Sequence, residues 1–471
     1  MTKAELLNKV ESLRWTLPRN FHDRLAENLY GEANIIASKR TIRNGTSRRL
    51  AWQRTADRIL TSPWTGFPVM ALLFTTVLWM TIAGANVPSG MLYGLLIEQG
   101  HPFLKNITAS IGLWSWLDGL MIDGIYLTLA WVISVMLPPM AIFFPLFTLL
   151  EDLGYLPRVA FNLDHLFQRA GAHGKQSLTM TMGLGCNAAG VIAARVIDSP
   201  RERLIAIVTN NFSLCNGRWP TQIMVAAVFL GALVPPALAS LTAAISVFVV
   251  ATIGFGLAFI VSWFLSRSFL KGEVSSFSLE LPPYRPPKIL RTLYTSLIDR
   301  TLFVLWRAIV FAVPAGAAIW LVSNINIGGN SIAWWMVTGL DPLAWAIGLT
   351  GVILVAYIVA IPANEIVIPT VLMLTVHMTG LTGVGEQGAG VMFETGDHSI
   401  LTQILTAGGW TTLTAICLMV FSLCHNPCST TIYTIYKETK SKRWTVVATF
   451  MPLAIGFALC ASIALVWRLV A

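Results

Sequence analysis

The sequence predicts an all-α integral membrane protein, and three observations lead to that prediction. The 471-residue chain is 55% hydrophobic and only 12% charged, and its mean hydropathy is +0.67. A soluble domain carries about 25% charged residues, so this composition cannot cover a surface that faces water. The charge is also uneven, because residues 1–60 hold 18 of the 55 charged side chains. These features exclude a soluble enzyme, a disordered chain and a disulfide scaffold.

Long uncharged segments mark the expected membrane spans, since about 20 apolar residues cross a bilayer. We expect about nine transmembrane helices, some of them broken or re-entrant where proline interrupts the apolar run. The segments that hold them are, in chain order, residues 59–97, 124–150, 219–266, 308–340, 342–385, 399–436 and 444–467.

Lys and Arg predict which loops are cytoplasmic. Basic residues outnumber acidic ones by 12 to 6 in residues 1–60 and by 6 to 3 in residues 267–300. The loop 386–398 instead holds three acidic residues and no Lys or Arg. We therefore expect a multi-pass protein of the cell membrane with a cytoplasmic N-terminus. Nucleic acid is not an expected partner, because cytoplasmic loops of membrane proteins are basic for topological reasons.

A short internal repeat divides the membrane part into two related halves. Phe212-Ser213-Leu214-Cys215-Asn216 recurs as Phe421-Ser422-Leu423-Cys424-His425-Asn426. Each copy follows a polar interruption that contains Gly or Pro, at residues 183–187 and 362–365. Paired repeats with broken helices are typical of secondary transporters, whose binding site lies near the bilayer midplane. If both copies belong to one gate, Cys215 and Cys424 should lie near each other.

The expected organisation has four parts. They are a cytoplasmic basic N-terminal arm (1–60), a first span with the first repeat (61–266), a cytoplasmic linker (267–300), and a second repeat with the C-terminal span (301–471).

Glu365 is the sharpest single candidate for a functional residue. It is the only charged residue between Asp341 and Glu386. Carboxylates inside a membrane are costly and tend to mark ion or proton paths, and Pro362 frees carbonyls just before it. The alternative is a carboxylate that caps a half-helix N-terminus, and the two roles can coexist.

Cysteines at the interruptions are candidate soft ligands for a metal. Cys424, His425 and Cys428 lie within five residues, and thiolate with imidazole suits Fe, Zn or Cu better than Mg or Ca. Cys186 beside Asn187 and Cys215 beside Asn216 are weaker candidates by spacing alone. Cysteines within uninterrupted apolar helices usually serve packing. The full candidate set is Cys186, Cys215, Glu365, Cys424, His425 and Cys428, with Asn187, Asn216 and Asn364 in support.

At these motifs the sequence resembles the membrane domain of the ferrous iron transport protein B family. The resemblance implies two gate-type repeats and inward passage of Fe²⁺, with Cys186, Cys215 and Cys428 as gate ligands. Glu365 falls where the family has an acidic residue in its second gate. The stretches that carry the resemblance are residues 55–66, 149–158, 173–175, 183–187, 215–220, 280–285, 427–428 and 438–439.

Two departures from the family pattern affect the interpretation. The family's GTPase domain is not found here, since residues 1–60 are too short for it. The look-alike phosphate loop at residues 171–177 has Arg169 and Gln176 where the pattern needs Gly and Ser or Thr. Cys424 and His425 stand where the family is commonly apolar, which could alter the metal preference.

The sequence therefore predicts a transporter rather than an enzyme, with no GTPase domain on this chain. Its cargo would be Fe²⁺ or another divalent transition metal, with no permanent cofactor. A separate G protein or small accessory protein could dock on the cytoplasmic face, and homo-oligomer formation stays open. Two alternatives also stay open: a non-transporting metal sensor or scaffold, and a small-solute, nucleoside-like carrier. The carrier needs aromatic stacking at the interruptions, where only Trp219 lies.

Overall fold

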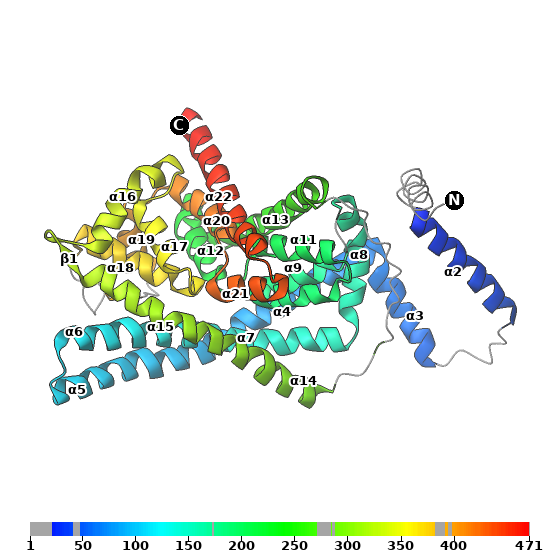
Figure 1. Cartoon of the computed structure of the whole chain (residues 1–471), viewed down its shortest axis with the longest axis horizontal. Helices are drawn as coiled ribbons and strands as arrows, with labels where there is room; N and C mark the ends of the chain where they lie inside the picture. The colour runs from blue at the N-terminus through cyan, green and yellow to red at the C-terminus, as the bar shows by residue number, and fades with distance from the viewer. Residues whose placement is uncertain are drawn as a thin grey trace, which may run out of the picture.

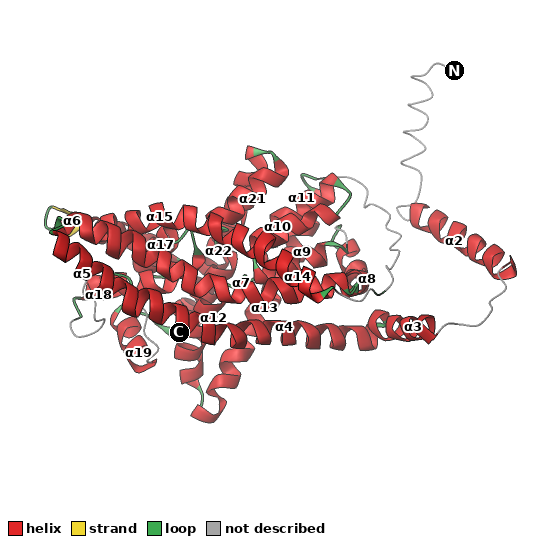
Figure 2. Ribbon diagram, turned by 90° about the horizontal axis from the view of Figure 1, so that it is seen from below, coloured by secondary structure: helices red, strands yellow, loops and turns green. Residues whose placement is uncertain are grey.

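The computed structural model describes residues 21–40, 48–171, 174–270, 284, 288–381, 391–393 and 398–470. Helices make up nearly all of this structure, and one short pair of antiparallel strands joins two of them (Figure 2). The acidic residues of the loop 386–398 and His173 lie outside the described residues, as do residues 271–283 and 285–287 of the linker and residues 1–20 and 41–47 of the arm.

The α-helices of the first part of the chain are α2 Phe21–Arg40, α3 Arg48–Thr61, α4 Pro63–Tyr93, α5 His101–Ile111, α6 Ser115–Asp118, α7 Leu127–Asp152, α8 Tyr155–Arg169, α9 Gln176–Gly185, α10 Asn187–Ala193, α11 Pro200–Thr209, α12 Trp219–Val225 and α13 Pro236–Arg267. Those of the second part are α14 Ile289–Thr295, α15 Phe303–Asn324, α16 Ile332–Ala346, α17 Gly351–Val359, α18 Val367–Thr379, α19 His398–Ala407, α20 Thr412–Cys424, α21 Ser429–Thr439 and α22 Lys442–Val470. The strands are β1 Asn326–Ile327 and β2 Asn330–Ser331. Figure 1 shows their arrangement.

The all-α membrane fold is confirmed, but the count of nine crossings is not. Among the described residues, six helices are long and apolar enough to cross a membrane. A seventh is added if α16 and α17, bent by 113° at their junction, form one span. The difference arises because apolar length alone does not show where a run bends. Residues 219–266, for example, form one long helix and a short apolar helix, Trp219–Leu233, instead of two spans.

Both halves contain a helix break with the same backbone form. Cys186 separates α9 from α10 in an extended conformation, with φ −154° and ψ 122°. Ala363 separates α17 from α18 with φ −150° and ψ 119°. An asparagine follows each of them, Asn187 and Asn364. The first break is Cys186 alone, whereas the second covers residues 360–366 and includes a 3₁₀ turn, Asn364–Ile366. Helix ends leave backbone groups outside the helical ladders, so both breaks expose polar main chain within the protein.

Arg218 joins the two halves at the centre of the molecule. Its guanidinium is buried, at 1% exposure, and donates to the carbonyl and the side-chain oxygen of Asn211, each at 2.9 Å. It also donates to the carbonyls of Leu423, His425 and Asn426, at 2.9, 3.3 and 3.4 Å. These last carbonyls lie at the C-terminal end of α20, where the helix dipole is negative. The buried charge is therefore compensated by the main chain of the opposite half.

Three of the sequence stretches that carry the resemblance noted above meet at one end of the bundle. The guanidinium of buried Arg158 donates to Asp57 at 3.0 Å, and the hydroxyl of Tyr284 donates to the same carboxylate oxygen at 2.9 Å. The Arg158 guanidinium also lies 4.0 Å from the centre of the Tyr284 ring. Burial and the hydrogen bond to Asp57 raise the pKa of Tyr284 to about 12, so the phenol stays a donor. The arm, the first half and the linker are thus tied together.

The first two spans form a hairpin much longer than a bilayer. Helix α4, a π-helical segment Gly94–Gly100 and α5 run on as one 48-residue helix from Trp64. At 1.5 Å per residue this is about 70 Å, more than twice the hydrocarbon thickness of about 30 Å. The chain turns at Gly112, whose left-handed φ of 70° favours glycine, and returns through α6 and α7. The hairpin is therefore too long to lie wholly within the hydrocarbon layer.

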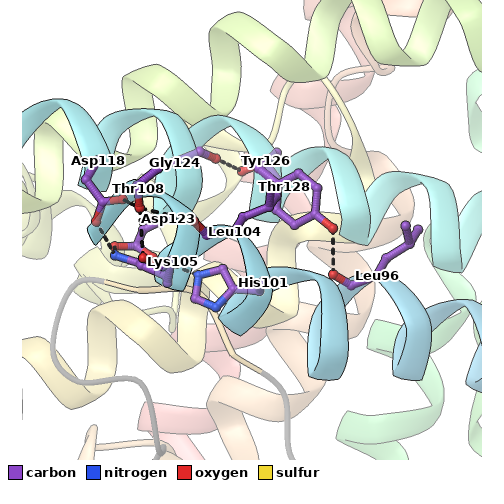
Figure 3. A network of polar contacts seen from close by, with 10 residues as sticks. All are labelled: Leu96, His101, Leu104, Lys105, Thr108, Asp118, Asp123, Gly124, Tyr126 and Thr128. Carbon is purple, nitrogen blue, oxygen red and sulfur yellow. Dashed lines mark hydrogen bonds and ion pairs between the residues drawn. The ribbon is translucent and has the colours of Figure 1, made fainter. Parts of the chain in front are cut away.

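A network of charged groups closes this hairpin (Figure 3). The Lys105 ammonium donates to Asp118 at 3.0 Å and to Asp123 at 2.6 Å. The other oxygen of Asp123 lies 2.8 Å from Nε2 of His101, and Thr108 donates to Asp118 at 2.5 Å. Each carboxylate is thus bound from two sides, which aligns the two antiparallel helices.

We expect Lys105→Met to loosen the hairpin. The change removes the cation that pairs with Asp118 and Asp123, whose side chains are only 19% and 12% exposed. The effect is moderate because the Lys105 side chain itself is one-third exposed. A loss of about 1 kcal/mol follows, equal to a fall of about 1 °C in the unfolding temperature of a chain of this size. Thermal unfolding in detergent measures it, with the exposed Lys437→Met as control. Equal unfolding temperatures for the two variants would contradict a stabilising role.

Arg218→Met should be far more damaging than a surface substitution. The change leaves at least three carbonyls without their hydrogen-bond donor. Each buried polar group without a partner lowers the free energy of unfolding by about 1–3 kcal/mol. Arg218→Lys should be intermediate, because an ammonium has three donors where a guanidinium has five. The yield of monodisperse protein after heating measures both, with the exposed Arg54→Met as control. A Met variant as stable as the control would show that the halves do not depend on Arg218.

Candidate metal centre

A small chamber lies where the two helix breaks meet. Its volume is about 30 Å³, and both halves of the chain contribute to its wall. The polar and sulfur-bearing residues that line it are Cys186, Asn187, Cys215, Asn216, Asn364, Glu365, Cys428, Thr430 and Thr431. Most of the candidate set from the sequence is therefore gathered around one cavity, although its members are separated by up to about half of the chain.

The break at Cys186 is set by close packing on its N-terminal side. A side chain at Gly185 would come within 2.0 Å of the Phe143 ring, so only glycine fits at the end of α9. The carbonyl of Gly185 accepts a hydrogen bond from the backbone of Asn216 at 3.2 Å. This bond places the loop of Cys215 against the first break. Cys186 itself is half-buried and lines the chamber.

Glu365 reaches the chamber from the second break. It lies in the single 3₁₀ turn Asn364–Ile366, directly before α18. Its carboxylate packs against Gly217, where a β-carbon would come within 2.4 Å of Oε1. The glycine between Cys215 and Arg218 therefore leaves the space that the carboxylate occupies. A residue from each half is needed to place this charge.

Asn364 links two of the candidate ligands. Its amide nitrogen lies 3.9 Å from the sulfur of Cys215, within hydrogen-bonding distance for sulfur. Its side-chain oxygen lies 3.1 Å from Nε2 of His425. The other ring nitrogen of His425 donates to the carbonyl of Ser422 at 2.8 Å, and the ring packs against Tyr357. His425 thus lies against Asn364, and Asn364 contacts Cys215.

Cys428 stands at the N-cap of α21, directly after Pro427. Its backbone is extended, its sulfur lies 3.2 Å from the hydroxyl of Thr431, and it lines the chamber. The next residue, Ser429, donates from its backbone to the carbonyl of Ile361 at 2.9 Å. The start of α21 is therefore fastened to the second break.

Cys424 and His425 lie behind the chamber wall. Cys424 is fully buried, and its β-carbon is close to Gly456 of α22, where a side chain would come within 2.9 Å. Arg218, two residues after the first repeated segment, donates to the carbonyl of Leu423 in the second segment, so the link between these two regions uses the main chain of the second. The expected proximity of Cys215 and Cys424 stays a prediction. Ligation by Cys424 or His425 stays a prediction. Cys417 and Cys460 pack against each other between α20 and α22, as expected.

The chamber is not a preassembled metal cage. Within the described part of the chain, no three His, Cys, Asp or Glu side chains are grouped so that they could hold a metal ion. Cys186, Cys215, Cys428 and Glu365 surround the cavity, and a bound ion would have to draw them together.

The look-alike phosphate loop has a structural role. The Lys175 ammonium donates to Asp198 at 2.8 Å and to the carbonyl of Val196 at 3.0 Å. The backbone of Gly174 donates to Asp164 at 2.8 Å, and α9 begins directly afterwards. Lys175 is thus held by the chain's own acceptors.

Two residues outside the candidate set also shape the site, and the sequence carries a signal for each. Arg218 stands beside the repeated word at the edge of a long uncharged segment, and such a charge needs buried partners. Gly217 lies between a candidate ligand and that arginine, where a missing side chain indicates a close approach.

Comparison with known families matches both halves. Residues 133–232 and 305–442, together about half of the chain, match the Gate family, described as "Nucleoside recognition". Residues 247–299 match the family described as "Ferrous iron transport protein B C terminus". The gate matches include both helix breaks and both repeated words.

Several curated relatives are similar over much of the chain. An Fe(2+) transporter FeoB of Staphylococcus aureus (strain COL) is 28% identical over 484 residues, which cover 97% of this chain and 66% of the relative. One from Synechocystis is 30% identical over 340 residues, covering 72% and 51%. One from Salmonella typhimurium is 30% identical over 298 residues, covering 61% and 35%. The chain thus spans about two thirds or less of these relatives.

No solved structure matches the chain significantly. The matches instead rest on sequence, and they follow the gate motifs on both sides of the chamber. The chain belongs to the Gate family and corresponds to the membrane portion of the FeoB family.

Proposed function

We propose that the chain carries Fe²⁺, or another divalent transition metal, inward across the cell membrane through the chamber between its two helix breaks. The observation that carries this proposal is the convergence of three thiols, one carboxylate and several amides on one cavity. The relatives that share the gate motifs are named Fe(2+) transporters. Thiol with carboxylate and amide oxygen is a mixed ligand set that suits a borderline metal ion such as Fe²⁺.

The size of the chamber supports an ion over an organic solute. A cavity of about 30 Å³ holds one or two water-sized groups. Pockets for small organic molecules measure about 300 Å³ or more. The chamber therefore disfavours the nucleoside-like carrier, and an ion that enters it must shed most of its water.

The proposed ligands are Cys186, Cys215, Cys428 and Glu365. Cys186 and Cys428 are half-buried and can turn toward an ion with little rearrangement, whereas Cys215 is 8% exposed. Asn187, Asn216 and Asn364 supply amide oxygens around them. In this proposal His425 positions Asn364 through their contact, and Cys424 packs.

The distribution of charged residues indicates the direction of transport and a source of energy for it. With the basic arm 1–60 and the linker 267–300 in the cytoplasm, the acidic loop 386–398 gathers cations outside. The membrane potential then favours cation uptake by about 2.3 kcal/mol per charge per 100 mV. A separate G protein or a small accessory protein would dock on the basic face.

Glu365→Gln should reduce Fe²⁺ uptake at least tenfold while the protein still inserts and purifies. The amide keeps the volume and removes the only carboxylate that lines the chamber in the described structure. Uptake into proteoliposomes that contain only this chain measures it, with the exposed Glu98→Gln as control. If Glu365→Gln takes up Fe²⁺ at the wild-type rate, Glu365 only caps the helix that follows it. If the wild-type protein binds Fe²⁺ but does not transport it, the alternative function, a non-transporting metal sensor, is favoured.

Gly217→Ala should impair uptake without unfolding the protein. The new methyl group would lie within 2.4 Å of the Glu365 carboxylate, which must swing away because it is the mobile end of its side chain. Gly256→Ala is the matched control, since nothing lies within 4 Å of a methyl group there. We expect at least a fivefold weaker Fe²⁺ affinity for Gly217→Ala alone. Equal Fe²⁺ affinity in Gly217→Ala and Gly256→Ala would show that the position of the Glu365 carboxylate does not affect ion binding.

A further inference from the structure

Three cavities follow one another from the surface to the chamber. The largest has a volume of about 610 Å³ and is here called the vestibule; α4, α7, α12, α18 and α19 line it. The smallest, of about 10 Å³, is called the neck. Asn216 lines the vestibule, the neck and the chamber alike. Trp219 is shared by the vestibule and the neck, and Gly185 by the neck and the chamber. The shared walls place the neck between the other two.

The vestibule is wide and uncharged. Its polar groups include the side chains of Asn86, Ser89, Ser134 and Asn216, and none of the described residues that line it carries a charge. Asn86 and Ser89 belong to the second half of α4, remote from its start at Pro63. With the N-terminus inside, the vestibule opens toward the outer side. It can hold a hydrated cation without trapping it.

The neck is narrow and held in place. Trp219 directly follows Arg218, whose hydrogen bonds to both halves fix the start of α12. The backbone of Asn216 is bound to Gly185. The indole N–H of Trp219 is buried and has no hydrogen-bond partner within the part of the chain that the structure describes. A buried donor of this kind favours one water molecule, which matches a neck of about 10 Å³.

We infer that Asn216 and Trp219 form a dehydration neck that separates the outer vestibule from the metal chamber and selects against strongly hydrated cations. The cargo of this path rests on the proposed function. A cation in the vestibule keeps its water, and it must lose most of that water to pass a gap of one water molecule. Fe²⁺ regains ligands from the thiols beyond the neck. Mg²⁺ sheds water reluctantly and prefers oxygen ligands, so it stays outside.

The test opens the neck with Trp219→Ala. A membrane-impermeant cationic thiol reagent is applied from the outer side, and mass spectrometry follows the modification of Cys186, which lies beyond the neck. We expect modification at least tenfold faster than in the wild type. The ratio of Fe²⁺ to Mg²⁺ uptake into proteoliposomes should fall at least tenfold. Trp219→Phe, which keeps an aromatic plug, should stay within about twofold of the wild type for both readouts.

Trp79→Ala is the matched control, because it removes the same side chain at a position that is 67% exposed on α4. Asn216→Ala provides a second opening of the neck if Trp219→Ala does not purify, and it should also speed modification of Cys186. Unchanged modification and an unchanged uptake ratio in the opened variants overturn the inference. A different result is also informative: Cys186 is modified faster in the opened variants, but no protein, wild type included, takes up metal. That result would support the access route through the neck and would refute the proposed transport function.

Discussion

The hydrogen bonds of Arg218 to the end of α20 are the constraint on which the rest of the structure depends. A guanidinium at 1% exposure in an apolar protein requires buried acceptors, and Asn211 together with the unpaired carbonyls of a helix C-terminus supplies them for its two terminal nitrogens. The three residues before Arg218 and the one after it are thereby fixed against the opposite half. Those residues are Cys215, Asn216, Gly217 and Trp219, which form part of the chamber and the neck. One charge thus aligns the ligands, the space for the carboxylate and the access route.

The two breaks explain why polar chemistry can exist in this place. Cys186 and Ala363 share an extended backbone; Cys186 alone separates α9 from α10, whereas Ala363 lies within the longer break between α17 and α18. The main chain released in this way is then used within each half: the Gly185 carbonyl accepts from the backbone of Asn216, and the Ile361 carbonyl accepts from the backbone of Ser429. Irregular backbone is tolerated at membrane depth only where protein or a polar cavity satisfies it. The chamber is therefore the place that the breaks make available.

The sequence predicted the all-α membrane fold and the gathering of Cys186, Cys215, Cys428 and Glu365, because charge and interruptions leave a strong pattern in an apolar chain. It did not predict the number of spans, since a bend such as the 113° between α16 and α17 leaves apolar length unchanged. It did not predict that Cys424 is absent from the chamber lining, because a repeated segment does not show which way each side chain points. Pairing of Lys105 with Asp118 and Asp123 depends on a hairpin turn at Gly112 that local pattern does not reveal.

The loose arrangement of the ligands agrees with transport better than with storage. A preassembled cage would hold its ion tightly, whereas conduction requires binding that is favourable enough to enter and weak enough to leave. Here no three candidate ligands are grouped beforehand within the described residues, so part of the binding energy is spent in drawing them together. The rigid elements are instead the neck and the glycine that admits Glu365. In the proposed path, walls that strip water followed by thiols that replace it would let one site discriminate between cations and still release them.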